Sequence, residues 1–206
     1  MTESEQQAAY EDTLRYRMKR ELRKRMRSLR SAHPATALAA RSLRIVDRIV
    51  SLEAWSTART VALFMSMPDE VQLGELIRIA REDGRRVALP VVTDAPALVF
   101  RAPFDGGMEH GMVTSAFGIA EPSEDAPTVG YEDIDLVVVP ALAIDPRGHR
   151  IGYGAGYYDH TLPLASRAVR VGVVFEFQLI VETPARTADV PVHWIVTDTR
   201  TMRAEP

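Results

Sequence analysis

The chain has 206 residues, of which 46% are hydrophobic and 26% are charged, a composition typical of a soluble globular protein with one substantial core. It contains no cysteine, which excludes disulfides, thiolate metal sites and a cysteine nucleophile. The formal net charge of −3 gives no overall attraction to nucleic acid, and no apolar run approaches the roughly 20 residues of a membrane span. The polar, acidic start lacks the features of a signal or transit peptide, so we expect a cytoplasmic protein with no membrane partner.

The first predicted element is a helix from Tyr10 to about Ser31, preceded by nine residues without periodicity. Its packing face is predicted from apolar residues at helical spacing, namely Leu14, Met18, Leu22, Met26 and Leu29. Nine of the chain's 25 basic residues also lie in this helix: Arg15, Arg17, Lys19, Arg20, Arg23, Lys24, Arg25, Arg27 and Arg30. Most of these side chains are expected on a solvated face, but such a local excess indicates an anionic partner, either a polyphosphate ligand or nucleic acid.

Short apolar runs then alternate with helical stripes. Strands are predicted at 60–66, 86–92, 97–101, 134–140, 169–175 and 194–198, and helices at 35–51, 73–84 and 156–164. This alternation predicts an α/β domain with a largely parallel sheet, with 134–140 as the central strand. We expect a single domain over residues 10–200, with flexible tails at 1–9 and 201–206.

A glycine-rich stretch follows the predicted central strand and reads Asp145-Pro-Arg-Gly-His-Arg-Ile-Gly-Tyr-Gly-Ala-Gly-Tyr-Tyr-Asp159. A strand that leads through a glycine-rich turn into a helix lets backbone N–H groups approach an oxyanion closely. With Arg147, Arg150 and Asp159 present as well, the pattern favours a phosphate site over a purely structural connection. Ligands of such sheets lie beyond the carboxyl ends of the strands, so the turn 67–70 is expected to face the same crevice.

Other chemistries find no support in the sequence. There is no Gly-x-x-x-x-Gly-Lys-Ser/Thr, no complete dinucleotide fingerprint and no Gly-x-Ser-x-Gly elbow, and the five histidines lack zinc-ligand spacing. What remains is oxygen chemistry, in which Asp and Glu at loop ends suit Mg²⁺ and the nearby arginines and glycines suit phosphates.

The stretch from Asp135 to Asp159 resembles the signature of the 5-formyltetrahydrofolate cyclo-ligase family. Three further motifs, in the same order along the chain, resemble that family: Lys19-Arg-Glu-Leu-Arg23, Phe64-Met-Ser-Met-Pro-Asp-Glu70 and Phe117-Gly-Ile-Ala-Glu-Pro122. The resemblance covers about residues 15–200. The glycine loop is a specific signal, whereas each of the other motifs alone is weak, so their order along the chain carries the resemblance.

The resemblance implies a three-layer αβα Rossmann-like fold, similar to that of sugar-phosphate isomerases and CoA transferases. It also implies a reaction in which ATP and Mg²⁺ drive the cyclisation of 5-formyltetrahydrofolate to 5,10-methenyltetrahydrofolate, through phosphorylation of the formyl oxygen and with release of ADP and phosphate. The expected partner is this small-molecule substrate, and we expect a monomer without nucleic acid.

The resemblance also implies roles for individual residues. The implied catalytic residues are Arg150 and Tyr157, and the implied metal ligands are Asp159 and Asp189. The implied ATP-binding residues are Lys19, Arg23, Arg150, Gly152, Tyr153, Gly154, Ala155, Gly156, Tyr157 and Tyr158. The implied substrate-binding residues are Met65, Glu70, Phe117, Tyr153 and Tyr157.

The chain departs from the family pattern at three positions. In some family members, basic residues stand at the positions of Tyr153 and Ala155. In bacterial-type members, a glycine usually stands at the position of Ala155. His193 occupies a position that is acidic in many members, and we expect it to line the site.

Two alternatives stay open at this point. The first is a non-catalytic nucleic-acid or polyphosphate binder that uses the basic first helix, and RNA binding over a salt series would discriminate it. The second is a sugar-phosphate isomerase of similar fold, which would need no ATP.

Overall fold

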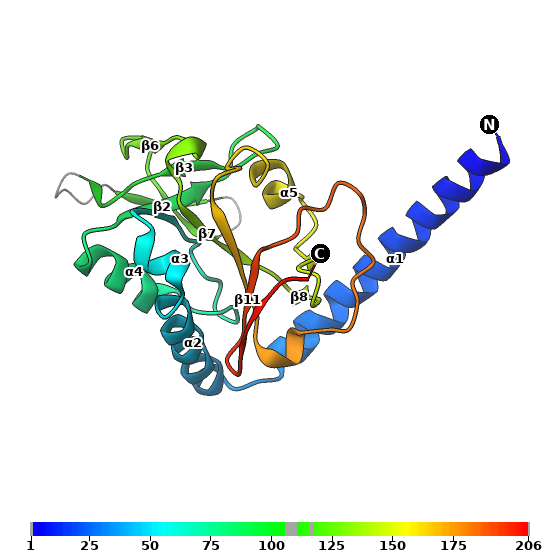
Figure 1. Ribbon diagram of the computed structural model, residues 1–206, viewed down its shortest axis with the longest axis horizontal. Helices are drawn as coiled ribbons and strands as arrows, with labels where there is room; N and C mark the ends of the chain where they lie inside the picture. The colour runs from blue at the N-terminus through cyan, green and yellow to red at the C-terminus, as the bar shows by residue number, and fades with distance from the viewer. Residues whose placement is uncertain (1, 106–110, 116–117, 206) are drawn as a thin grey trace.

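One mixed sheet forms the centre of the protein. In the computed structural model, which describes residues 2–105, 111–115 and 118–205, eight strands pair in a single order (Figure 1). From edge to edge they are β12 (Thr201–Arg203), β11 (Trp194–Val196), β10 (Val169–Val173), β7 (Leu136–Pro140), β1 (Thr60–Ala62), β2 (Arg86–Val91), β3 (Val99–Arg101) and β6 (Thr128–Val129).

Strands β11, β10, β7, β1 and β2 are parallel, whereas β12, β3 and β6 pair antiparallel at the two edges. Strand β7 lies in the middle and is a continuous apolar run, Leu136-Val-Val-Val, because side chains on both of its faces are buried. The predicted α/β class, the largely parallel sheet and the central position of β7 are therefore confirmed.

Helices α2 (Ala35–Val50), α3 (Glu53–Thr57) and α4 (Gly74–Glu82) cover one face of the sheet. The other face packs against α5 (Tyr157–Thr161) and the turns that follow it. Successive strand residues alternate between the two cores: Val138 packs with the first helical layer, and Val137 and Val139 pack with the second. These layers confirm the predicted αβα arrangement.

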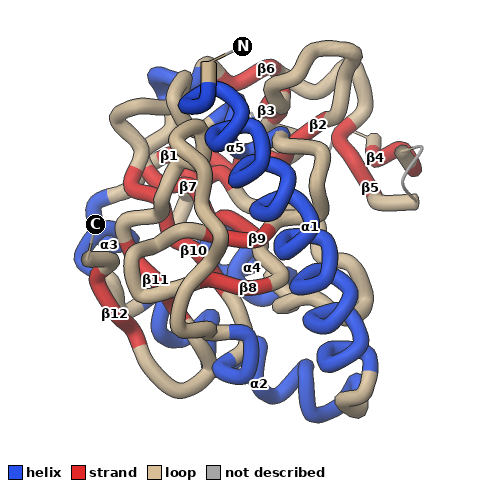
Figure 2. The backbone as a smooth tube through the Cα atoms, turned by 90° about the vertical axis from the view of Figure 1, so that its right-hand side faces the viewer, coloured by secondary structure: helices blue, strands red, loops and turns tan. Residues whose placement is uncertain are grey.

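Helix α1 (Glu3–Ser31) stands apart from these layers. It begins at Glu3 rather than at the predicted Tyr10, and Figure 1 shows its first half extending away from the body. Its second half crosses the hairpin of β8 (Ala143–Ile144) and β9 (Arg150–Ile151), as Figure 2 shows. None of the described helices is long and apolar enough to cross a membrane.

The predicted packing face of α1 is only partly correct. Met26 is buried and Leu22 packs beside it, but Leu14, Met18 and Leu29 are exposed. The inward face is completed by charged residues, because Lys19 and Arg30 are buried at positions that share the helical spacing of Met26. The apolar spacing was misleading here because part of the surface that α1 covers is polar: the buried Lys19 meets Asp189, and the buried Arg30 meets the hydroxyl of Tyr153.

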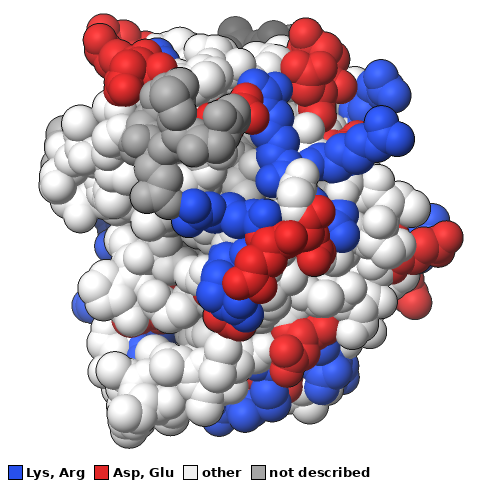
Figure 3. All heavy atoms as spheres, turned by 90° about the vertical axis from the view of Figure 1, so that its left-hand side faces the viewer, with Lys and Arg blue, Asp and Glu red and all other residues white. Residues whose placement is uncertain are grey.

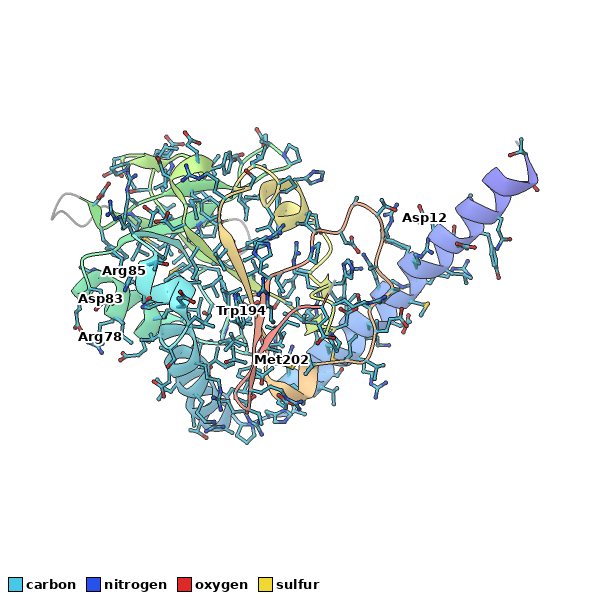
Figure 4. All side chains as sticks on the ribbon, viewed as in Figure 1. Asp12, Arg78, Asp83, Arg85, Trp194 and Met202 are labelled. Atoms are coloured by element: carbon cyan, nitrogen blue, oxygen red, sulfur yellow. The ribbon has the colours of Figure 1, made fainter. Side chains whose placement is uncertain are left out.

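The C-terminal segment differs from the expected loose tail. Residues 201–203 form β12, in which Met202 pairs with Ile195 and Arg203 with Trp194 of β11. Figure 4 labels Met202 and Trp194 on these two neighbouring strands. This edge strand has largely exposed side chains, so it lacks the apolar run that marks the inner strands in the sequence.

Hairpins also escaped prediction, among them β8–β9 and the pair β4 (Met112–Thr114) and β5 (Ala120–Pro122). Their strands are two or three residues long, too short to give a periodic signal. Two 3-10 turns, Tyr131–Asp133 and Glu176–Gln178, complete the described elements.

On the face shown in Figure 3, which lies on the side of α4, basic and acidic side chains are interspersed. Ion pairs explain this arrangement on α4 and the adjoining strand. Arg78 contacts both Glu75 and Glu82, and Arg86 pairs with Asp105 at 2.9 Å.

Candidate active site

A cavity of about 550 Å³ opens where the central parallel strands end. Its walls include Phe64 after β1, Pro90 of β2 and Pro140 of β7, which places it at the carboxyl edge of the sheet, as expected for this class of fold. Helix α1 forms another wall through Tyr16, Lys19 and Arg23.

The cavity brings together the predicted site residues of the described chain. They are Lys19, Arg23, Met65, Glu70, Arg150, Gly152, Tyr153, Gly154, Ala155, Gly156, Tyr157, Tyr158, Asp159 and Asp189. Phe117 lies outside the described residues, but Ile119 and Glu121 of the same motif line the cavity.

The first half of the glycine-rich stretch is structural. Asp145 is fully buried, and its carboxylate accepts hydrogen bonds from the backbone N–H groups of Arg147 and His149 and from the N–H and hydroxyl of Thr183. Gly148 turns the hairpin with φ +84°, and a Cβ there would lie 2.5 Å from the carbonyl oxygen of Val192. The expected strand–turn–helix connection is thus interrupted by the β8–β9 hairpin.

The second half, from Gly152 to Gly156, forms the cavity loop. Gly154 (φ +118°) and Gly156 (φ +78°) have conformations that L-residues rarely adopt. None of the described non-glycine residues has a positive φ, so an alanine at position 155 is compatible with the loop. The Nε of Arg23 donates to the carbonyl of Gly152 at 2.9 Å and ties the loop to α1.

Two ion pairs form the charged side of the cavity. The Nζ of Lys19 lies 2.5 Å from Oδ2 of Asp189, and Nη2 of Arg150 lies 2.8 Å from Oδ1 of Asp159. Arg150 also donates to the carbonyl of Val190, and Val190 donates its N–H to Asp159. Burial lowers the pKa of Arg150, while the neighbouring Asp159 carboxylate opposes that shift.

The two aspartates suit a cation that also binds phosphates. Within the described residues, no group of three or more His, Asp or Glu could hold a metal, and Asp159 and Asp189 each have one carboxylate oxygen without a hydrogen bond. Because Mg²⁺ commonly takes only one or two protein carboxylates when phosphates and water complete its shell, this donor set fits Mg²⁺.

The opposite side of the cavity centres on Glu70, which is 5% exposed. Its Oε1 accepts the hydroxyl of Tyr153 at 2.5 Å, and its Oε2 accepts the N–H of Met67 at 2.9 Å. Burial raises the pKa of Glu70, and these hydrogen bonds partly offset the rise. Burial likewise raises the pKa of Tyr153 and of Tyr158, so both phenols stay protonated and can donate.

The sequence did not single out several residues that shape the cavity. Tyr16, Glu121 and Arg186 line it, and Arg30 contacts the hydroxyl of Tyr153 from outside the lining. Arg30 lies seven residues after Arg23 on the same face of α1, a spacing that is visible in the sequence. Glu121 is buried and accepts the N–H of Val92 at 3.3 Å, a role that local sequence does not reveal.

His193 is not part of the site, so the expectation that it lines the cavity is wrong. It is exposed at the edge of β11, where its Nδ1 accepts the backbone N–H of Arg170 at 3.1 Å. Burial and the nearby Arg170 lower the pKa of His193.

The family model described as "5-formyltetrahydrofolate cyclo-ligase family" matches residues 15–198, nearly the whole chain. The chain belongs to the 5-formyltetrahydrofolate cyclo-ligase family. This membership confirms the sequence resemblance and makes the protein an enzyme of the cyclo-ligase type.

Among the similar proteins, the 5-formyltetrahydrofolate cyclo-ligase of Mycolicibacterium smegmatis is 34% identical over 70% of this chain and 76% of its own. That of Escherichia coli K12 is 30% identical over 69% of this chain and 80% of its own. The structure of Aquifex aeolicus 5,10-methenyltetrahydrofolate synthetase aligns with a TM-score of 0.80 at 28% identity, covering 92% of this chain and 94% of that chain.

Proposed function

We propose that this enzyme uses ATP and Mg²⁺ to convert 5-formyltetrahydrofolate to 5,10-methenyltetrahydrofolate, with release of ADP and phosphate. One observation carries the proposal: a single cavity joins a side with Lys19, Arg23 and the glycine loop to a side with Met65 and Glu70. The first side suits a polyphosphate, and the second suits a flat, partly apolar ligand with N–H donors.

The proposed chemistry has two bond-forming steps. The formyl oxygen attacks the γ-phosphorus of ATP, and the bond to ADP breaks. N10 of the folate then attacks the activated formyl carbon and loses its proton, and the carbon–oxygen bond breaks to release phosphate. Such a reaction requires mainly positioning of the reactants and stabilisation of charge on phosphoryl oxygens.

The charged side of the cavity supplies these requirements. Lys19 and Arg23 would bind the polyphosphate together with the backbone N–H groups of residues 152–156. Arg150 would stabilise the transferring phosphoryl group, and Tyr157 would hold the reacting end of the substrate. Asp159 and Asp189 would hold Mg²⁺, which when bound neutralises charge on the phosphates.

The opposite side would bind the folate. The Glu70 carboxylate would accept hydrogen bonds from pterin N–H groups, while Met65 and Tyr153 would contact the ring. The inward orientation of Lys19 and Arg23 favours a small anionic ligand over a nucleic-acid surface, because both of these basic side chains face the cavity.

The direct test supplies purified protein with 5-formyltetrahydrofolate, ATP and Mg²⁺ and follows the absorbance of methenyltetrahydrofolate. Product should form only when all three are present, and chelation of Mg²⁺ should stop it. Folded protein that forms no product under these conditions would overturn the proposal.

Substitution of Arg150 separates its proposed role from general effects of charge. Arg150→Ala should lower kcat roughly 100-fold or more, because it removes a cation placed against developing charge. Arg147→Ala is the matched control, since Arg147 lies in the same hairpin but pairs with Glu182 at 2.9 Å outside the cavity. Equal loss of kcat in both variants would contradict the role given to Arg150.

A further inference from the structure

Three segments that are distant in the sequence meet at the hydroxyl of Tyr153. Arg30 of α1 donates from Nη2 to that oxygen at 2.7 Å, and the hydroxyl in turn donates to Oε1 of Glu70 at 2.5 Å. Arg30 also donates to Oδ1 of Asp69 at 2.8 Å, and its Nη1 lies 3.9 Å from Oε1 of Glu70. One guanidinium therefore contacts both the turn 67–70 and the cavity loop.

Burial disfavours the charged form of Arg30, and its contacts with Asp69 and Tyr153 outweigh that effect and raise its pKa. The side chains of Arg30 and Glu70 are only 3% and 6% exposed, and ionised groups lose much solvation free energy at such depth. Moreover, Nε of Arg30 is buried without a hydrogen-bond partner among the described residues. Buried donors without partners are rare in folded proteins, so a guanidinium in this position calls for a reason beyond packing.

The geometry also fixes which way the Tyr153 hydroxyl points. Because Arg30 can only donate, the phenol oxygen must accept from it and direct its own hydrogen to Glu70. The same contact places the Arg30 guanidinium 5.7 Å from the centre of the Tyr153 ring. Tyr153 and Glu70, both of which line the cavity, are thus held in one arrangement by a residue behind them.

We infer that Arg30 is a positioning residue for the folate side of the cavity, where it orients the Tyr153 hydroxyl and holds the Glu70 carboxylate as a hydrogen-bond acceptor. This inference rests on the proposed function for the identity of the ligand. The expected change in the pKa of Glu70 is independent of the proposed function, because that pKa can be measured without any substrate.

The charges around Glu70 determine in which direction its pKa should change when Arg30 is replaced. Burial raises the pKa of Glu70, whereas Tyr153, Met67 and Arg30 lower it. Asp69 of its own turn raises the pKa of Glu70, and the Glu70 carboxylate in turn raises the pKa of Tyr158 of α5. Loss of Arg30 should therefore raise the pKa of Glu70 further, so that a higher pH is needed to keep the carboxylate ionised.

The test compares Arg30→Met with Arg25→Met, a matched change at an exposed position of the same helix. The Glu70 carboxyl is titrated by NMR in protein with 13C-labelled glutamate, and its signal is assigned with Glu70→Gln. Arg30→Met should raise the pKa of Glu70, as expected for the loss of a nearby opposite charge. Arg25→Met should leave it unchanged, and an unchanged pKa in folded Arg30→Met would overturn the inference.

The second measurement is steady-state kinetics over a range of pH. In Arg30→Met, the KM for 5-formyltetrahydrofolate should rise about tenfold, as expected for a lost charged hydrogen bond. The acid limb of the pH profile of this KM should move to higher pH. The KM for ATP should stay within about twofold, which a general structural defect would not produce. Parallel rises in both KM values with an unmoved acid limb would contradict a positioning role.

A conservative variant covers the case in which Arg30→Met does not fold. Arg30→Lys keeps the charge but loses the planar fork that reaches Asp69 and Tyr153 together. It should leave the pKa of Glu70 close to that of the wild type while raising the folate KM about fivefold. A wild-type folate KM in folded Arg30→Lys would overturn the inference, whereas a wild-type enzyme that forms no methenyltetrahydrofolate would overturn the proposed function alone.

Discussion

Gly154 shows how one backbone conformation shapes the cavity loop. Its φ of +118° is rarely adopted by L-residues, and its position leaves room for the Arg23 guanidinium, which would lie 3.6 Å from an added Cβ. Since that distance is an ordinary van der Waals contact, the requirement for glycine here is one of conformation rather than of space.

Gly154→Ala should therefore strain the loop by about 1–2 kcal/mol and raise the KM for ATP roughly tenfold. Gly152→Ala is the matched comparison, because Gly152 lacks a positive φ and, beyond its chain neighbours, no atom of the described residues lies within 4 Å of an added Cβ. Steady-state kinetics with varied ATP should show a much smaller change for Gly152→Ala. The expectation fails if the two variants behave alike.

At the scale of elements, α1 docks through a face that mixes a small apolar patch around Met26 and Leu22 with charged contacts. Met26 packs on Leu142, Ala143 and Ile151 of the hairpin region, while Lys19 is paired with a carboxylate beyond it. The apolar contact holds the helix in place, and the charged residues define the cavity wall.

Met26→Ala should lower the free energy of unfolding by about 2–5 kcal/mol, as is typical when a large buried side chain is truncated. Met18→Ala tests the same substitution in the same helix at a side chain that is 54% exposed, and should change stability by less than about 0.5 kcal/mol. Urea unfolding followed by circular dichroism measures both. Similar losses of stability in the two variants would show that Met18 also packs against the body, as the apolar spacing of α1 predicted.

For the whole molecule, the cavity joins segments from opposite ends of the chain. Its lining runs from Tyr16 of α1 to Asp189 near the last parallel strand, and includes residues that follow β1, β2 and β7. A ligand bound there contacts several otherwise separate segments and should stabilise the folded state as a whole.

ATP with Mg²⁺ at about 100 times its Kd should add about 2.7 kcal/mol to the free energy of unfolding. For a chain of this length, that corresponds to a rise in Tm of roughly 5–10 °C, measurable by differential scanning calorimetry. The rise should be smaller in Gly154→Ala at the same ATP concentration. A Tm independent of ATP would argue against nucleotide binding in this cavity.

Much of this architecture could be predicted from the sequence, because the inner strands lie within buried apolar runs and α2 and α4 have regular stripes. The edge strand β12 and the short hairpins could not, because two or three partly exposed residues carry no periodic signal. The inward face of α1 was missed for another reason: Lys19 and Arg30 are buried by partners that lie far away in the chain.

The resemblance named the glycine loop, Glu70 and the two aspartates, and all of them line one cavity, while their roles stay predictions. The contacts that these side chains make with one another could not be predicted from the sequence. The contacts of Lys19 with Asp189 and of Tyr153 with Glu70 and Arg30 each join distant segments. Arg30 places a basic group at the hydroxyl of Tyr153.

Helix α1 is joined to the rest of the chain only through the short connection 32–34 before α2. It carries Lys19 and Arg23, yet it contributes no strand and lies outside both main cores. It can therefore be regarded as a tethered ligand of the remaining chain, held at a high effective concentration by that connection. A chain divided between His33 and Pro34 would separate the cations from the sheet, and recovery of activity on mixing the two fragments would follow their association equilibrium.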